Sequence, residues 1–166
     1  MRLFVAVRPP DAVLDSLEAL PRPTDTPTRW TTRDQWHVTL RFLGNVDDPD
    51  PVVRALDRVR QSLSPADVTL GPRAGVLGHQ VVYLPVAGLD AVAAAVIQAT
   101  RTFGAPPQTR RFKAHLTLAR TKGGIVDRSA LDVSAAWTVD HIELIRSHLG
   151  RGPATYETLQ TFTLGD

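Results

Sequence analysis

Apolar residues follow two kinds of spacing along the chain, and each spacing predicts a kind of element. Short apolar runs bounded by turn residues predict buried strands at 3–7, 67–70, 74–77, 80–86, 139–146 and 155–164. Apolar residues at helical spacing predict three helices, at 11–20, 50–63 and 89–103. Asp11 is expected to cap the first helix, and Pro21 to end it before a Pro/Thr-rich loop at 21–28. Strands interleaved with so few long helices indicate an α+β fold.

One four-residue pattern occurs twice, as His-Val-Thr-Leu at 37–40 and as His-Leu-Thr-Leu at 115–118. Side chains alternate between the two faces of a strand, so histidine and threonine point one way while the aliphatic residues point to the core. Trp36 and Ala114 fall on the core face by the same rule. Each segment therefore offers an imidazole and a hydroxyl on the face opposite to the core.

The two halves of the chain have a matching order and spacing. Each half runs strand, helix, proline-containing loop and histidine strand, and the opening strand begins 35 positions before His37 and 34 before His115. We therefore expect one bilobal domain over 1–166, with pseudo-repeats at roughly 1–78 and 79–166. Its two mostly antiparallel sheets, each backed by helices, are expected to face each other across a central groove.

Two histidines and two threonines form a set that suits phosphodiester cleavage. Of His37 and His115, one can take a proton from water while the other gives a proton to the leaving oxygen. Thr39 and Thr117 can donate hydrogen bonds to the non-bridging phosphate oxygens, and Arg120 can add positive charge. Strict alternation puts Arg120 on the face opposite to Thr117, so its reach depends on the strand ending or twisting near the glycine pair that follows.

A metal site is the weaker alternative for the two histidines. Neither segment has an adjacent carboxylate on the histidine face, and two histidines alone make a poor site. We therefore expect no metal and no cofactor. A single His-x-Thr is common by chance, whereas two copies in corresponding places favour a catalytic pair. The other histidines lack a paired threonine and are expected in core or surface roles: His79, His141 and His148.

The basic residues suggest a polyanionic partner. Of the 19 basic residues only Lys113 and Lys122 are lysines, in a chain of net charge +2. A GC-rich genome accounts for much of this arginine, but its planar fork also suits phosphate oxygens. Phe42 is expected to pack, with stacking on a base as the alternative. A basic rim that would favour RNA comprises Arg29, Arg33, Arg41, Arg110, Arg111 and Lys113.

Cysteine is absent from the chain, which excludes disulfides, thiolate metal sites and a cysteine nucleophile. No apolar run approaches the roughly 20 residues that span a bilayer. The apolar stretch at the N-terminus is too short for a signal peptide. We therefore expect a cytoplasmic monomer with no membrane association and no obligate partner.

Longer stretches around both motifs resemble the two-histidine phosphoesterase superfamily. Within it, they are most similar to the bacterial and archaeal RNA 2′,3′-cyclic phosphodiesterases, also called 2′-5′ RNA ligases. The similar stretches are RLFVAV, RW, WHVTLRFLGNV, VVYLPV, RFKAHLTLAR and IELIRSHLGRGPATYETLQTFTL. Ala114 stands where a proline is common in the family, and Tyr83 and Pro85 where tryptophan and glycine are frequent. These departures bear on packing more than on chemistry.

The resemblance implies a bilobal fold and a metal-independent attack of water on a 2′,3′-cyclic phosphate that leaves a 2′-phosphate. His115 would activate water and His37 would protonate O3′, although the symmetry of the motifs leaves the reverse assignment open. Thr39, Thr117 and Arg120 would hold the phosphate. The implied partner is RNA with a cyclic phosphate end, tRNA fragments included, and the reverse reaction with a 5′-hydroxyl would be a 2′-5′ ligation.

Two alternatives from other functional classes remain. A non-catalytic module that binds RNA ends would use the same groove but would not need both imidazoles. A phosphodiesterase for small nucleotide cyclic phosphates would need both histidines but would gain nothing from a longer substrate.

Overall fold

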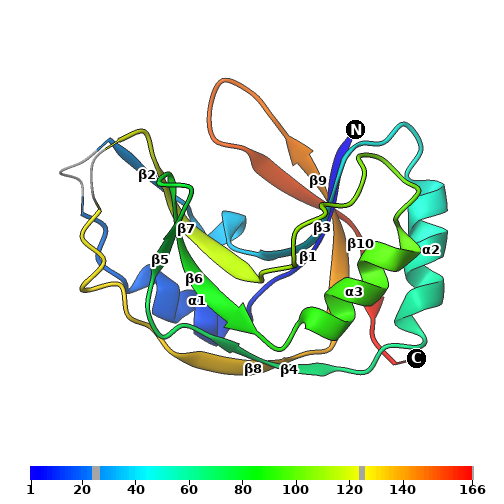
Figure 1. The fold of residues 1–166 in the computed structure, drawn as a ribbon, viewed down its shortest axis with the longest axis horizontal. Helices are drawn as coiled ribbons and strands as arrows, with labels where there is room; N and C mark the ends of the chain where they lie inside the picture. The colour runs from blue at the N-terminus through cyan, green and yellow to red at the C-terminus, as the bar shows by residue number, and fades with distance from the viewer. Residues whose placement is uncertain (24–26, 124–125, 166) are drawn as a thin grey trace.

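The chain folds into a strongly curled antiparallel sheet with helices at both ends (Figure 1). The computed structural model describes residues 1–23, 27–123 and 126–165. Its helices are α1 Asp11–Glu18, α2 Asp50–Arg60 and α3 Asp90–Ala99, with a 3-10 turn, η1, at Arg33–Gln35. Its strands are β1 Arg2–Val7, β2 Thr28–Trp30, β3 Val38–Asn45, β4 Ala66–Leu70, β5 Gly75–Leu77, β6 Val81–Ala87, β7 His115–Thr121, β8 Ala135–Val139, β9 His141–His148 and β10 Thr155–Thr163. The predicted α+β class is confirmed.

The strand order shows how the two halves of the chain are combined. The sheet runs β10-β9-β1-β3-β7-β6-β4-β8, with β2 also paired to β7 and β5 to β6. β4 and β5 lie early in the chain but pair with β6, whereas β9 comes late and pairs with β1. β3 joins β7 through the pair Val38 and Leu116. The two sheets expected from the sequence are thus the two sides of one curled sheet, joined at the histidine strands, and the internal duplication stays a prediction.

The first strand is buried on both faces, which places a small second core beside the main one. Leu3, Val5 and Val7 belong to the main hydrophobic cluster, together with the apolar faces of the helices. Phe4 and Ala6 point the other way and pack in a separate small cluster with β9 and β10. This second cluster is next to the first histidine motif, because Phe4 contacts the ring of His37.

The helices cover opposite ends of the sheet. α2 and α3 lie side by side against β3 and β10, while α1 lies at the other end, beside η1 (Figure 1). Each helix is shorter than its apolar stripe predicts, and Asp11 is the first helical residue rather than the cap, which is Pro10. None of the helices within the described residues is long and apolar enough to cross a membrane.

Three short elements escaped the pattern analysis. β2 and η1 have three residues each and lie in a stretch dominated by proline, threonine and charged residues. β8 is only partly buried along its length, so its apolar signal is weak. Residues 24–26 of the predicted loop at 21–28 lie outside the described residues.

Candidate active site

The two histidine motifs meet where β3 and β7 join. Val38 of β3 and Leu116 of β7 are paired and fully buried. The antiparallel register puts His37 and Thr117 on one side of this pair, and Thr39 and His115 on the other. All four side chains are only partly buried and alternate with core residues, as the sequence pattern predicts.

Both imidazoles are oriented in the same way by the backbone. Nδ1 of His37 lies 2.7 Å from the carbonyl oxygen of Gln35, and Nδ1 of His115 lies 2.8 Å from that of Lys113. A carbonyl can only accept, so each neutral ring carries its hydrogen on Nδ1 and presents a lone pair at Nε2. Nε2 of His37 lies 3.1 Å from Oγ1 of Thr39, which can donate to it. In each imidazole, Nδ1 is therefore bound to the backbone, and Nε2 is the nitrogen that can exchange a proton with a substrate.

His37 lies in an aromatic environment that disfavours its charged form. The ring centroids of Phe4 and Tyr156 lie 4.9 Å and 5.2 Å from that of His37, and the tyrosine is edge-on to the imidazole. Burial lowers the pKa of His37 to about 4, opposed by its hydrogen bond to Gln35 and reinforced by electrostatic interaction with Arg8, His115 and Arg120. His37 is thus neutral at pH 7 in the free protein, and the residues that act on its charge come from both halves of the sheet.

His115 has a more open environment with a similar edge-on tyrosine. The ring centroid of Tyr83 lies 5.7 Å from that of His115. The ammonium of Lys113 lies 5.2 Å from the centroid of the same tyrosine ring. Tyr83 is paired with Thr117 across β6 and β7, so it is a neighbour of both functional groups of the second motif.

A β-bulge on β7 decides where Arg120 points. Thr117 and Ala119 pair with successive residues of β6, so Leu118 is an extra residue on β7. Leu118 and Ala119 are both buried, whereas Arg120 is exposed. The bulge therefore shifts the alternation by one and returns Arg120 to the face of Thr117. The prediction required the strand to end or twist near Gly123 and Gly124, and the bulge supplies this change earlier in the strand. Gly124 lies outside the described residues.

β3 has the same bulge at the corresponding position. Thr39 and Arg41 pair with successive residues of β1, which leaves Leu40 unpaired. Leu40 and Arg41 are buried, and Phe42 is 39% exposed. Phe42 therefore occupies on β3 the place that Arg120 occupies on β7. The guanidinium of Arg2 lies 4.6 Å from the centroid of the Phe42 ring.

Arg8 is a charged neighbour of His37 that the sequence analysis missed. It directly follows β1, and its Nε lies 3.0 Å from Oε2 of Glu143 on β9. The two side chains are only 29% and 13% exposed. Their partnership depends on the pairing of β1 with β9, two strands from opposite ends of the chain, so no local pattern could have indicated it.

The predicted basic rim is only partly present. Arg29, Arg110, Arg111 and Lys113 are exposed, and Arg29 is the cross-strand partner of Arg120 between β2 and β7. Arg41 is a correction, because it is 5% exposed. Its guanidinium donates to the carbonyl oxygens of three residues that connect β3 to the loop after α3: Phe42, Phe103 and Ala105.

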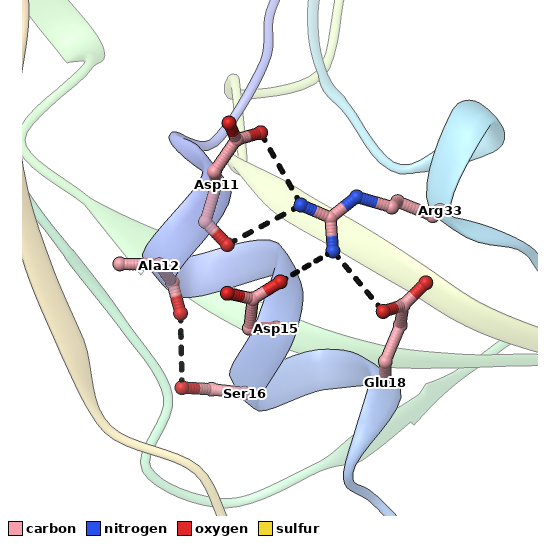
Figure 2. Close-up of polar contacts among 6 residues, drawn as sticks. All are labelled: Asp11, Ala12, Asp15, Ser16, Glu18 and Arg33. Atoms are coloured by element: carbon pink, nitrogen blue, oxygen red, sulfur yellow. Dashed lines mark hydrogen bonds and ion pairs between the residues drawn. The ribbon is translucent and has the colours of Figure 1, made fainter.

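Arg33 is a second correction to the predicted rim. Its guanidinium bonds to three carboxylates on α1, at 3.2 Å from Asp11, 2.7 Å from Asp15 and 3.1 Å from Glu18 (Figure 2). These three acids lie on one side of α1 because they are spaced by about one helical turn. Arg33 therefore fixes η1, which leads into β3, to the first helix, and its charge is already balanced.

The remaining histidines lie apart from this set, as expected. His79 is exposed, His141 bonds to Asp140, and His148 bonds to Glu157. Among the residues that the structure describes, no group of three or more His, Cys, Asp or Glu side chains is placed to hold a metal ion.

The chain is similar in sequence and fold to known proteins. The model of the 2′-5′ RNA ligase superfamily matches residues 9–151. The crystal structure of TT0787 from Thermus thermophilus is similar at 26% identity and a TM-score of 0.86, covering 99% of this chain and 98% of that one. E. coli LigT in complex with 3′-AMP is similar at 27% identity and a TM-score of 0.72, over the same 99% and 98%. No curated protein matches the sequence.

Proposed function

The chain belongs to the 2′-5′ RNA ligase superfamily, as its sequence motifs indicate, and from this membership we propose that it hydrolyses RNA 2′,3′-cyclic phosphate ends to 2′-phosphates without a metal ion. One observation carries the proposal: each of the two imidazoles has its Nδ1 bound to a backbone carbonyl. His37 directly precedes β3 and His115 begins β7, and these two strands are paired with each other. The Nε2 atoms of the imidazoles supply a proton acceptor and, after protonation, a proton donor.

In the proposed reaction His115 acts as the base. Its Nε2 takes a proton from water as the water oxygen forms a bond to phosphorus. The bond from phosphorus to O3′ breaks, and O3′ takes a proton from Nε2 of His37. The products are a 2′-phosphate and a 3′-hydroxyl, and exchange of one proton with solvent restores both imidazoles.

His37 must be protonated before it can act as the acid. In the free protein its pKa is about 4. A bound phosphate would raise this pKa, because its negative charge offsets the positive charges that surround the imidazole. A histidine of low pKa is also a strong donor once protonated. The reverse assignment, with neutral His37 as the base, is the alternative.

The other predicted residues would hold the substrate. Thr39 and Thr117 would donate hydrogen bonds to the non-bridging oxygens, and Arg120, on the same face, would balance their charge. Phe42, with exposed ring surface at the place that corresponds to Arg120, would stack on the terminal base. The exposed Arg110, Arg111 and Lys113 would add attraction for an RNA strand.

The same groups could run the reaction backwards. A 5′-hydroxyl in place of water would attack the cyclic phosphate and form a 2′-5′ linkage without ATP. We propose this ligation as a secondary activity of a monomeric, cytoplasmic enzyme built as one bilobal domain with pseudo-repeats at roughly 1–78 and 79–166. Incubation with tRNA halves that yields no joined product would remove the ligation but not the hydrolysis.

The decisive experiment is hydrolysis of an RNA oligomer with a 2′,3′-cyclic phosphate end in the presence of EDTA. We expect turnover to a 2′-phosphate, lowered by roughly 10²–10⁴-fold in His37→Ala and in His115→Ala. His141→Ala, a histidine outside the site, is the matched control and should retain full activity. Binding of the oligomer without turnover would support the non-catalytic module instead. Activity that EDTA abolishes would show a metal-dependent reaction.

A further inference from the structure

A cyclic phosphate end leaves an RNA strand only one direction in which to continue. The 2′ and 3′ oxygens of the terminal nucleotide are both bonded to the cyclic phosphate, so the rest of the RNA is attached through its O5′. Two routes follow the histidine strands away from the site: one along β3, past Phe42, and one along β7, past Arg120. These two routes differ in charge.

The route along β3 leads to acidic residues. Phe42 is the exposed residue past the bulge, and the segment that follows the strand carries three carboxylates in the sequence NVDDPD. Two of them, Asp47 and Asp48, are exposed, as is Asp50 at the start of α2. A phosphate chain along this route would meet repulsive charge.

The route along β7 leads to basic residues. Arg120 is exposed near the end of β7, and Lys122, also exposed, directly follows the last residue of that strand. Arg29 of β2 is directly opposite Arg120 and is also exposed. These three cations therefore gather at the end of β7 that lies beyond His115 and Thr117.

Within the described part of the chain, no ion pair offsets the positive charges of the paired Arg29 and Arg120. Like charges directly opposite each other on adjacent strands are destabilising. Among the ion pairs of residues 1–23, 27–123 and 126–165, none involves Arg29, Arg120 or Lys122. Arg33, by contrast, is matched by three carboxylates nearby in the fold. The uncompensated pair is the arrangement expected where an anionic ligand supplies the opposite charge.

The backbone holds this pair in register. The hydroxyl of Thr31 lies 2.8 Å from the carbonyl oxygens of both Thr117 and Leu118, at the bulge of β7. The backbone N–H of Thr31 also donates to Leu118, at 2.9 Å, and the indole N–H of Trp36 donates to the Thr31 hydroxyl at 2.8 Å. These hydrogen bonds attach the C-terminal end of β2 to β7. They fix the position of Arg29 beside Arg120 before any ligand binds.

We propose that Arg29, Arg120 and Lys122 form a phosphate track that binds the RNA strand on the 5′ side of its cyclic end. The inference rests on the proposed function and deepens it, because it makes an RNA strand rather than a mononucleotide the preferred substrate. Arg120 serves the cyclic phosphate and begins the track. Arg29 and Lys122 bind the next phosphodiesters through charge-assisted hydrogen bonds.

Three substrates with the same terminal nucleotide test the phosphate track. They are the 2′,3′-cyclic mononucleotide, the dinucleotide with a cyclic end, and the same dinucleotide with an uncharged methylphosphonate linkage. In the wild type, the phosphodiester should raise kcat/KM about tenfold over the mononucleotide, and the methylphosphonate should remove most of that gain. This comparison needs no variant and is independent of any effect on folding.

Variants then assign the gain to residues. In Arg29→Gln and Lys122→Gln, the ratio of kcat/KM between dinucleotide and mononucleotide should fall toward one. In Arg29→Gln, the methylphosphonate should cause little further loss, because the same interaction is already missing. Arg54→Gln, an exposed arginine on α2 at the far end of the molecule, is the matched control and should keep the full ratio (Figure 1).

The outcomes separate this inference from the proposed function. Turnover of all three substrates at equal kcat/KM would overturn the phosphate track and leave the hydrolysis intact. A full gain in Arg29→Gln and in Lys122→Gln would also overturn it. No turnover of any of the three substrates by the wild type would overturn the proposed function itself.

Discussion

Val38 of β3 is paired with Leu116 of β7, and this antiparallel pair joins the two sides of the sheet. The register puts His37 and Thr117 on one side of the pair, and Thr39 and His115 on the other. The two histidine motifs therefore meet at this pair. The junction of the two sides of the sheet is therefore also the frame of the candidate active site.

Leu116→Ala tests how strongly this junction is held. Leu116 is fully buried, and truncation of a buried leucine to alanine costs about 2–5 kcal/mol of unfolding free energy. Urea denaturation should show a loss in that range. Leu149→Ala is the control, since this leucine is 67% exposed and its loss should change stability by no more than about 0.5 kcal/mol. Equal stability of the two variants would contradict a packed junction.

A substrate with sulfur in place of the bridging O3′ should identify the acid. A thiolate leaves without protonation more readily than an alkoxide, so the variant that lacks the acid should recover with this substrate. We expect His37→Ala to regain activity relative to wild type by at least tenfold, and His115→Ala to regain little. Rates of phosphate ring opening with the two substrates are the measurement. Recovery of His115→Ala instead would establish the reverse assignment of acid and base.

The pH dependence of stability should report the lowered pKa of His37. An unfolded histidine titrates near 6.5, and His37 in the folded protein near 4. Between these values the unfolded chain binds a proton that the folded protein does not, so stability falls as pH drops through this window, by up to about 3 kcal/mol. Urea denaturation at pH 7, 5.5 and 4.5 measures the loss.

His37→Gln should lose this part of the pH dependence, because its side chain does not titrate. His141→Gln should retain it, as a control for removal of any histidine. A wild type and a His37→Gln variant with the same pH dependence would show that the pKa of His37 is not lowered.

Arg41→Met should affect stability rather than RNA binding. Its guanidinium donates to the carbonyl oxygens of Phe42, Phe103 and Ala105, and loss of a buried partner costs about 1–3 kcal/mol. Chemical denaturation of Arg41→Met beside Arg54→Met, an exposed arginine, measures the difference. If the variant kept the unfolding free energy of the wild type but had a raised KM for RNA, Arg41 would instead be a substrate-binding residue.

Strand alternation was sufficient to predict which face His37 and His115 occupy, because a two-residue period is a local property. The same rule failed at Arg120, since the bulge at Leu118 breaks the period. Nothing in the composition of Leu118-Ala119 marks a bulge. The extra residue is defined only by the pairing of β7 with β6.

The roles of the arginines were not readable from sequence. Arg33 and Arg41 flank the first motif as closely as Arg29 does, but one is matched by carboxylates on α1 and the other is buried against backbone carbonyls. Arg8 acts on His37 from β1, and its partner Glu143 lies on β9. Such assignments depend on contacts between residues far apart in the chain, which composition and spacing do not encode.

The exchange of strands between the two sides of the sheet has a consequence for folding. β1 pairs with β3 on one side and with β9 on the other. β9 follows β3 in the sequence by about a hundred residues, so it is synthesised much later. Pairings between distant segments slow folding, because a long loop must close before its contacts form. During synthesis the edge of β1 that β9 later covers stays open until residues 141–148 emerge, so the aromatic environment of His37 is among the last parts of the molecule to be completed.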